Sequence, residues 1–234
     1  MSDAATTPVL ELRGAIPAPT GGRLPSVPLD LRVLPGAWVF IEVRSPLQAR
    51  EFADLCCGVL PLRSGNVRFL DRDWADLPVE LVAALRGRIG RLYGAEAWID
   101  FLPTDTNILL PQVYHTRRPE PALREQATTL SVRFGLPGLP MMRPDSLTPG
   151  DLMRASCVRA FIGEPSLLLL DNPEVERIAE LVPALANALM AGGNQRLASI
   201  WLTQSKTLWQ DRSLPVSARF RLLDHGLVPE KAPA

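Results

Sequence analysis

The chain has 234 residues, of which 47% are hydrophobic, and it carries 25 Lys plus Arg against 25 Asp plus Glu. This length fits one large domain, and the hydrophobic fraction is high enough to build a sizeable core. Because the charges balance, the composition excludes a global electrostatic field that would favour nucleic acid or an anionic membrane surface as a partner.

The first part of the chain alternates strand patterns with helical ones. Short β-rich or alternating runs predict strands, and apolar side chains at helical spacing predict helices. The Pro- and Gly-rich stretch at residues 15–28 predicts a loop or a hairpin region. The expected strands are Val9–Arg13, Leu29–Val33, Trp38–Val43, Asn66–Leu70 and Ile89–Tyr93, and the expected helices are Gln48–Leu60 and Leu81–Arg86.

The second part of the chain is richer in helical patterns. Residues 100–111 are irregular, and residues 135–145 interrupt regular structure strongly. The expected helices are Pro119–Phe134, Asp151–Ile162 and Glu176–Met190, and the expected strands are Leu167–Leu170, Ala198–Thr203 and Phe220–Leu223. Strands that alternate with helices indicate an α/β domain with a mostly parallel sheet. We expect a single domain over residues 1–234, with a core at 1–94 and 146–228, a helical subdomain at 95–145 and a disordered tail at 229–234.

The cysteines and the apolar runs bear on the compartment of the protein. The chain has an odd number of cysteines without CxxC spacing, namely Cys56, Cys57 and Cys157. We therefore expect buried thiols in place of a disulfide framework or a zinc site. The N-terminus has no basic region followed by an apolar stretch, and no apolar run reaches the ~18 residues that span a bilayer. We therefore expect a soluble, cytoplasmic chain that meets a membrane only through a partner, and no nucleic-acid partner.

The most informative stretch reads LTPGDLMRASCVRAFIGEPSLLLLDNP, from Leu147 to Pro173. It resembles the ABC ATPase family, in which the signature LSGGQ, a helix with an ARA-like triplet, a Gly-Asp-Pro turn and the Walker B strand LLLLDEP follow one another without a gap. The matching positions are Leu147, Thr148 and Gly150 in the signature, Arg154 and Val158–Ala160 in the helix, Gly163–Pro165 in the turn, and Leu167–Asp171 with Pro173 in Walker B.

Other segments fall at the distances that the family shows, so the resemblance covers about Val9 to Val228. They are Pro35-Gly36, Cys57–Leu60, Ser64-Gly65, Asn107–Pro111 and Leu223–Gly226. The resemblance implies a P-loop NTPase-like ABC ATPase core with a mostly parallel sheet, an N-terminal antiparallel β region and an inserted helical subdomain. It also implies ATP and Mg²⁺ as cofactors, a homo- or heterodimer with another ABC ATPase subunit, and a transmembrane permease that places the chain at the inner face of the cell membrane.

The stretch that aligns with the family's Walker A loop lacks the groups that hold phosphate. That loop, GxxGxGK[ST], surrounds phosphate with backbone N–H groups and adds a lysine and a Mg²⁺-binding hydroxyl. Here residues 43–51 contain no glycine, and no lysine occurs before residue 206. Ala49 stands at the lysine position, and Arg50 and Glu51 stand at the hydroxyl positions, where Glu51 adds negative charge. The degenerate Walker A residues are thus Ser45, Ala49, Arg50 and Glu51.

The catalytic positions depart from the family in the same direction. Asn172 stands where active members have the glutamate base, and base catalysis contributes typically ~10²–10⁴-fold. Gln204 stands at the switch-histidine position, and Gly94 stands at the Q-loop glutamine. Asp171 keeps the Walker B aspartate, which would ligate Mg²⁺ if the ion binds.

These departures predict a degenerate nucleotide-binding subunit of an ABC transporter with little or no ATPase activity and weak or absent binding of ATP and Mg²⁺. Thr148 and Gly150 could still complete the site of an active partner in trans. One alternative is a scaffold or regulatory module of a membrane complex that binds no nucleotide. Another is an ATPase that uses Arg50 as a phosphate clamp and Glu174 or Glu176 as the base.

Overall fold

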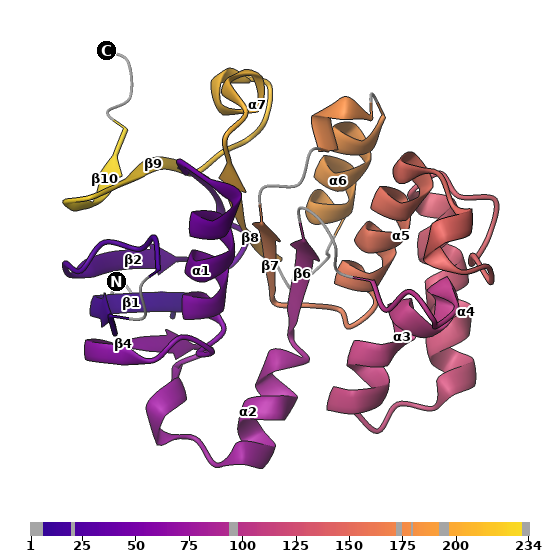
Figure 1. Cartoon of the computed structure of the whole chain (residues 1–234), viewed down its shortest axis with the longest axis horizontal. Coiled ribbons are helices and arrows are strands. Elements are labelled where there is room, and N and C mark those ends of the chain that lie inside the picture. Colours follow the sequence, from indigo (N-terminus) through magenta and orange to yellow (C-terminus); the bar gives the residue numbers. More distant parts are fainter. Residues whose placement is uncertain are drawn as a thin grey trace, which may run out of the picture.

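The computed structural model describes residues 7–19, 22–93, 98–171, 175–178, 180–191 and 197–230. The strands form an antiparallel sheet of four strands and a larger sheet of six. Helix α1 (Pro46–Cys56) lies between the antiparallel sheet and the larger sheet, and helices α5 (Pro149–Phe161) and α6 (Leu181–Met190) lie on the far side of the larger sheet (Figure 1). Among the described residues, no helix is long and apolar enough to cross a bilayer.

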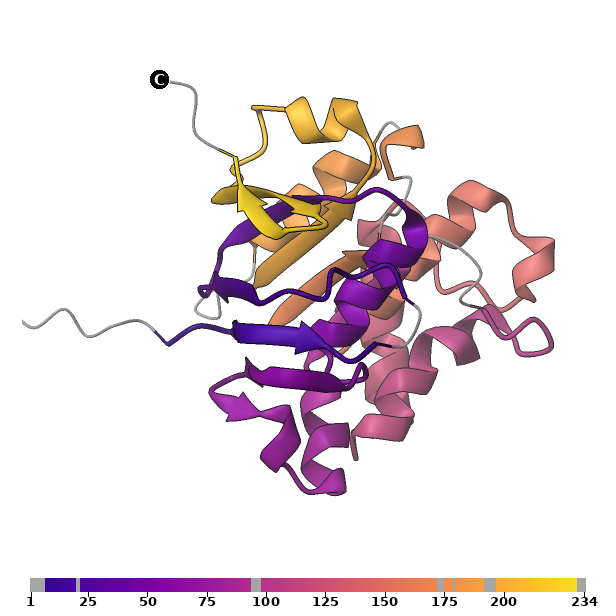
Figure 2. The same ribbon diagram turned by 60° about the vertical axis from the view of Figure 1, so that its left-hand side comes forward.

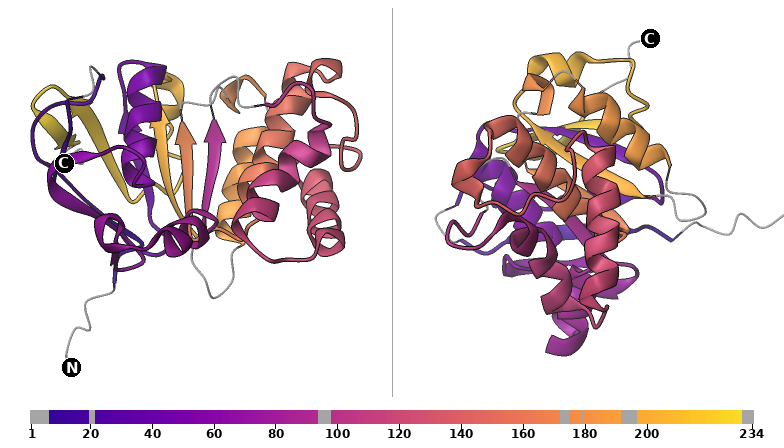
Figure 3. Two further views of the ribbon diagram at one scale, coloured as in Figure 1. Left: turned by 60° about the horizontal axis from the view of Figure 1, so that its bottom comes forward. Right: turned by 90° about the vertical axis from the view of Figure 1, so that its right-hand side faces the viewer.

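The larger sheet is mostly parallel, as the sequence predicts. Its order is β10-β9-β3-β8-β7-β6, and only the β9–β10 pair is antiparallel. Every residue of β7 and β8 is buried, as expected for parallel strands covered on both faces; Figure 3 (left) shows β6, β7 and β8 side by side. The strands are β3 Trp38–Glu42, β6 Ile89–Tyr93, β7 Leu167–Asp171, β8 Ala198–Thr203, β9 Ala218–Leu223 and β10 Gly226–Pro229.

The N-terminal strands form the expected antiparallel β region, with the order β2-β1-β4-β5 (Figure 2). Strand β1 continues to Pro17, well beyond the expected end at Arg13. Gly65 of β4 has a φ of +77°, and a Cβ there would collide with the carbonyl of Gly14, so glycine is required where the two strands cross this closely. The strands are β1 Leu10–Pro17, β2 Leu29–Val33, β4 Leu62–Phe69 and β5 Arg72–Asp73.

The two faces of the larger sheet build two separate cores. Trp38, Phe40 and Trp201 point to the face covered by α5 and α6, and Phe40 and Trp201 stack with their ring centroids 5.1 Å apart. Alternate residues such as Ile41 and Ile200 point to the other face, where α1 and the antiparallel sheet cover them. The three cysteines are free and buried, as predicted.

The expectation of irregular structure at residues 100–111 was wrong, because a helix, α3, runs from Thr104 to His115 with Pro111 inside it. The Asn107 amide nitrogen donates to the carbonyls of Ile99, Leu102 and Pro103, which fixes the turn before the helix. Ile108 and Leu109 are buried. Tertiary packing of these apolar residues outweighs the cost of an internal proline.

The other helices differ from the expectations mainly at their ends. Helix α6 begins at Leu181, after a short 3₁₀ turn at Val175–Arg177, so the helix expected from Glu176 was too long. A helix at residues 206–210 was not anticipated. The tail expected to be disordered from residue 229 begins in strand β10, and the Glu230 amide donates to the carbonyl of Arg219. The remaining helices are α2 Val79–Arg86, α4 Glu120–Arg133 and α7 Lys206–Gln210.

Gly90 of β6 sets the distance between this strand and α5. A Cβ at this position would collide with the backbone carbonyl of Ala160. We expect Gly90→Ala to lower the free energy of unfolding by about 2–3 kcal/mol, because backbone must move to admit the methyl group. Urea unfolding measures this, with Gly138→Ala as the control, since a Cβ at Gly138 meets nothing within 4 Å. An unchanged Gly90→Ala protein would contradict the tight packing of β6 on α5.

Candidate functional site

The candidate site lies at the carboxyl edge of the parallel sheet, where ligands bind in open α/β folds. Strands β3, β6, β7 and β8 all end at this edge, and Tyr93, the last residue of β6, is paired with Asp171, the last residue of β7. Three residues separate the end of β3 from the start of α1. The fold therefore brings the aligned Walker A and Walker B segments together, as the sequence predicts.

The N-terminus of α1 is capped by the chain itself. The Ser45 hydroxyl accepts a hydrogen bond from the Gln48 amide (3.1 Å), and the Gln48 side-chain oxygen accepts from the Arg44 amide (2.8 Å). The Ala49 amide donates to the carbonyl of Ser45, and Pro46, the first helical residue, has no N–H. This is close to a capping box, and it occupies the Gln48 amide, one of the donors at the helix start that would otherwise be available to an anion.

Most of the aligned Walker A stretch is helix and not loop. Residues 46–51 are the first residues of α1, and no residue from 43 to 51 has a left-handed φ. A phosphate nest alternates right- and left-handed backbone so that successive N–H groups point at one anion. Residues 43–51 therefore do not form such a nest.

The side chains of the stretch aligned with Walker A point in different directions. Ala49 lies on the inner face of α1 and is completely buried, whereas Arg50 is exposed. The Glu51 carboxylate accepts hydrogen bonds from the backbone amides of Arg23 (2.5 Å) and Leu24 (3.1 Å). The Glu51 carboxylate thus holds the loop after β1 against α1.

An arginine that the sequence analysis did not single out occupies the centre of the site. Arg91 of β6 reaches Asp171 with Nε (2.7 Å) and Nη2 (2.6 Å), both to Oδ2. Its Nη1 donates to Asp54 Oδ1 of α1 (2.5 Å), and its Nη2 also donates to the carbonyl of Arg50 (3.1 Å). One guanidinium thus ties β6, β7 and α1 together.

This cluster is buried and strongly coupled. The side chains of Arg91, Asp171 and Asp54 are 12%, 4% and 25% exposed. Burial alone would lower the pKa of Arg91, but the Asp171 carboxylate raises this pKa well above its ordinary value. Burial raises the pKa of Asp171 to about 7, although Arg91 acts in the opposite direction. Arg91 therefore stays charged and acts as a fixed cation beside Asp171.

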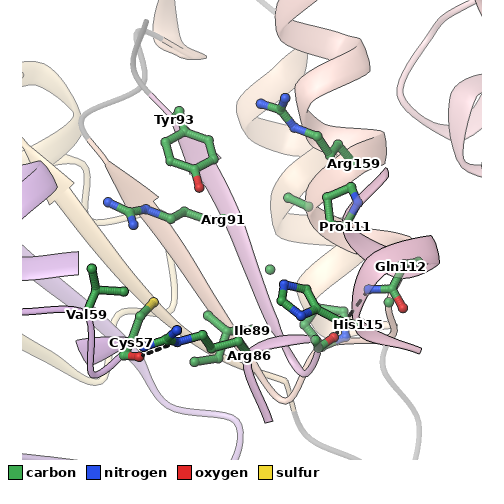
Figure 4. Close-up of a pocket in the computed structure, with 15 residues that line it drawn as sticks. Cys57, Val59, Arg86, Ile89, Arg91, Tyr93, Pro111, Gln112, His115 and Arg159 are labelled. Atoms are coloured by element: carbon green, nitrogen blue, oxygen red, sulfur yellow. Dashed lines mark hydrogen bonds between the residues drawn. The ribbon is translucent and has the colours of Figure 1, made fainter. Parts of the chain in front are cut away.

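Stacked aromatic and cationic side chains extend from this cluster toward α5. The guanidinium carbon of Arg91 lies 4.7 Å from the ring centroid of Tyr93, and that of Arg159 lies 5.5 Å from the same ring and 4.4 Å from Trp98. Figure 4 shows Arg91 and Arg159 on either side of Tyr93 in a cavity of about 180 Å³. An adjoining cleft of about 470 Å³ is lined by Arg50, Asp54, Arg91, Tyr93, Ile99, Asn107, Leu110, Pro111 and Arg159.

The signature segment is self-capped in a similar way. Thr148 is the N-cap of α5, and its hydroxyl accepts from the Asp151 amide (3.1 Å) and donates to Asp151 Oδ2 (2.8 Å). Gly150 lies in the first turn of α5, where a Cβ would meet the Thr148 Oγ1 at 3.8 Å, an ordinary van der Waals contact. Thr148 and Gly150, the residues predicted to contact a partner's nucleotide in trans, therefore lie at the start of α5. The Asp151 carboxylate occupies the same helix start.

The remaining predicted positions are partly outside the described residues. Gly94 and Asn172, and also Glu174, fall outside them, as does the side chain of Glu176. The Gln204 side chain donates to the carbonyl of Arg44 (2.8 Å), so it supports the connection between β3 and α1. The Val43 amide, in that same connection, donates to the carbonyl of Thr203 (3.0 Å).

The described residues do not fit a resident Mg²⁺. Oxygen ligands are what the ion requires, yet Asp171 Oδ2 and Asp54 Oδ1 already pair with one guanidinium. A divalent cation beside Arg91 would be repelled by it. In the described part of the chain, no group of three or more His, Cys, Asp or Glu side chains is placed so that it could hold a metal ion.

The sequence carries one signal that could have identified Arg91. Strand β6 reads IGRLY, and its arginine interrupts an otherwise apolar strand. A buried arginine almost always has an anionic partner. Since Asp171 ends a fully apolar strand, Arg91 and Asp171 were candidates to form an ion pair with each other.

Comparisons with known proteins agree with the fold. The structure superposes on the bacterial ABC transporter cassette MJ0796, solved as a dimer, with a TM-score of 0.78 and 17% identity over 96% of this chain and 99% of that one. No protein-family profile matches the chain. The fold is therefore that of an ABC ATPase, with a mixed sheet, an antiparallel sheet and helices.

The sequence relatives are more specific than the fold. The chain is 27% identical over 146 residues to the bacitracin export ATP-binding protein BceA of Halalkalibacterium halodurans, covering 62% of this chain and 57% of BceA. It is 25% identical over 201 residues to the lipoprotein-releasing system ATP-binding protein LolD of Idiomarina loihiensis, covering 86% of each. The match thus spans little more than half of BceA and most of LolD. Relatives and fold together support the ABC transporter ATP-binding cassette ATPase family for this chain.

Proposed function

We propose that this chain is a degenerate nucleotide-binding subunit of an ABC transporter that pairs with an active cassette and a membrane permease and hydrolyses no ATP itself. The observation that carries the proposal is the Arg91 guanidinium paired with Asp171 and Asp54. It puts a fixed cation where the family would place Mg²⁺. The partners and the transport role come from the names of the relatives, which include export and lipoprotein-releasing ATP-binding proteins.

Two further features support the loss of hydrolysis. The capped start of α1 leaves no nest for phosphate. The side chain of Ala49, at the position aligned with the family's phosphate-binding lysine, points into the core and not toward a nucleotide. Without a backbone nest and a lysine to hold it, a triphosphate is bound more weakly and its γ-phosphoryl group is poorly positioned. Phosphoryl transfer depends on such positioning and on charge stabilisation.

The Thr148–Asp151 pair favours a second candidate, a scaffold subunit that contributes nothing to its partner's site. Thr148 would have to release Asp151 before its hydroxyl could meet a γ-phosphate held by a partner. The Asp151 carboxylate would also repel that phosphate.

The experiment that tests these proposals measures ATP turnover by this chain alone and by its complex with an active ABC cassette. We expect no turnover above background for the chain alone and turnover for the complex. If the chain completes the partner's site, Thr148→Ala in the complex lowers turnover by about 10²-fold, as loss of an anion-stabilising donor does. If the chain is a scaffold, Thr148→Ala matches the control Thr129→Ala, which changes a residue of α4. Turnover by the isolated chain at the rate of an active cassette would overturn both.

A further inference from the structure

We propose that the cavity between β6, α3 and α5 is a binding site for a small organic carboxylate with a ring-sized apolar body. This cavity has a volume of about 180 Å³, and it lies between Arg86, at the end of α2, and Tyr93, at the end of β6 (Figure 4). The inference concerns the chain by itself and does not depend on the proposed loss of hydrolysis or on pairing with another cassette.

The charged side chains that line the cavity are cationic. Arg86, Arg91 and Arg159 contribute to its wall, and none of the described residues that line it is an Asp or a Glu. The charge of Arg91 is balanced by Asp54 and Asp171, which lie outside this lining. The wall therefore carries an excess of positive charge, which favours an anionic ligand.

Arg86 is the cation best placed to bind that ligand. Its Nε and Nη2 donate to the main-chain carbonyls of Cys57 (3.1 Å) and Gly58 (2.9 Å), which fixes the guanidinium at the cavity wall. Its Nη1 donates to none of the described residues, and no carboxylate among them forms an ion pair with Arg86. A guanidinium that is held in place but lacks a counterion is suited to a charge-assisted hydrogen bond with a carboxylate.

His115 of α3 adds a second polar group to the same wall. Its ring points into the cavity (Figure 4), and its Nδ1 is buried without a hydrogen-bond partner among the described residues. Burial and the charge of Arg86 lower the pKa of His115, so the ring is mostly neutral near pH 7. In the tautomer with the proton on Nδ1, it can donate to the second oxygen of a carboxylate.

The rest of the lining favours an apolar body on the ligand. An apolar cavity of about 150 Å³ holds a benzene molecule, so about 180 Å³ accommodates a six-membered ring with a carboxylate. Acetate or inorganic phosphate would satisfy the cations but leave the apolar walls uncovered. Those walls are formed by Val59, Ile89, Pro111, Ala160 and Pro165.

Benzoate binding to the full chain tests the proposal, with the histidine ring resonances and the melting temperature as readouts. The chain has two histidines, so His225, outside the cavity lining, serves as an internal control for His115. We expect benzoate to shift the His115 resonances alone, with a Kd of about 0.1–1 mM for a ligand of this size. At a tenfold excess over Kd, Tm should rise by about 2–4 °C. Benzyl alcohol, which lacks the charge, and acetate, which lacks the ring, should bind at least tenfold more weakly.

Matched variants assign the site. Arg86→Met should weaken benzoate binding at least tenfold, and Arg86→Lys, which keeps the charge, should weaken it less. Ala160→Met fills the cavity and should abolish binding, whereas the control Arg117→Met, at an exposed residue outside the cavity lining, should leave Kd unchanged.

The proposal is overturned if the wild type does not bind benzoate at millimolar concentration. It is also overturned if benzyl alcohol or inorganic phosphate binds as tightly as benzoate, or if folded Arg86→Met binds benzoate as the wild type does. If Arg86→Met is not obtained folded, Ala160→Met decides, and an unchanged shift of the His115 resonances in that variant would contradict the assignment of this cavity.

Discussion

Replacement of Arg91 by methionine is expected to lower the free energy of unfolding at pH 7 by about 3–5 kcal/mol, the loss typical of breaking one side of a buried ion pair. Methionine keeps most of the length of arginine and can still pack on Tyr93, so the loss reports the missing charge and not a large cavity. It leaves Asp171, which is 4% exposed, without its cationic partner. Urea unfolding followed by circular dichroism measures the effect.

A second substitution distinguishes loss of the ion pair from general damage to the site. In Arg91→Met/Asp171→Leu both buried charges are gone, and replacement of a whole buried pair by apolar residues is often neutral. We expect the double variant to recover most of the stability lost by Arg91→Met. If it is as unstable as the sum of the two single variants, the two side chains do not act as a pair and the account of this cluster is wrong.

Introduction of a lysine at residue 49, the position aligned with the family's Walker A lysine, is expected to damage the fold without producing nucleotide binding. Ala49 is completely buried among apolar side chains that include Phe52 and Ile41. A lysine there must either bury its charge or lose its proton, and pKa shifts of 3–5 units for buried lysines correspond to a cost of about 4 kcal/mol or more. We expect Ala49→Lys to unfold at much lower urea concentration than the wild type and to show no Tm increase with ATP and Mg²⁺.

The adjacent residue provides a matched control for this prediction. Arg50 is exposed on the same helix, so Arg50→Lys should change stability by no more than about 0.5 kcal/mol. The interaction of its backbone carbonyl with Arg91 is unaffected by this change. Equal stability of the two lysine variants, or ATP binding gained by Ala49→Lys, would show that the side chain at residue 49 can reach the cleft.

The sequence predicted the central sheet and the signature-to-Walker B segment well, because these elements have strong local patterns. Strands β6 and β8 have the expected bounds, Ile89–Tyr93 and Ala198–Thr203, since both are short apolar runs bounded by polar or flexible residues. Helix α1 was expected from Gln48 but begins at Pro46. The Ser45-Pro46 pair and the Gln at residue 48 are cap and first-turn signals that would have placed the start correctly.

The chemistry of the site could be predicted only in part, because it depends on contacts between distant segments. Counting positions aligned Ala49 with the family's lysine but could not show that its side chain faces the core. The pairing of Arg91 with Asp171 joins residues 80 positions apart. It arises because β6 lies next to β7 in the sheet, and strand order is not written in a local pattern. The helix at Thr104–His115 was missed for a similar reason, since Pro111 obscured it locally while packing of Ile108 and Leu109 stabilises it.

Equilibrium binding of ATP–Mg²⁺ to the intact chain, measured by titration calorimetry, tests the central claim most directly. If Arg91 and the capped start of α1 close the phosphate and metal positions, titration to millimolar nucleotide gives no saturable heat, and Tm does not change with ATP–Mg²⁺, because a ligand that does not bind cannot stabilise. A saturable isotherm with a Kd in the micromolar range, abolished by Asp171→Asn, would contradict the account.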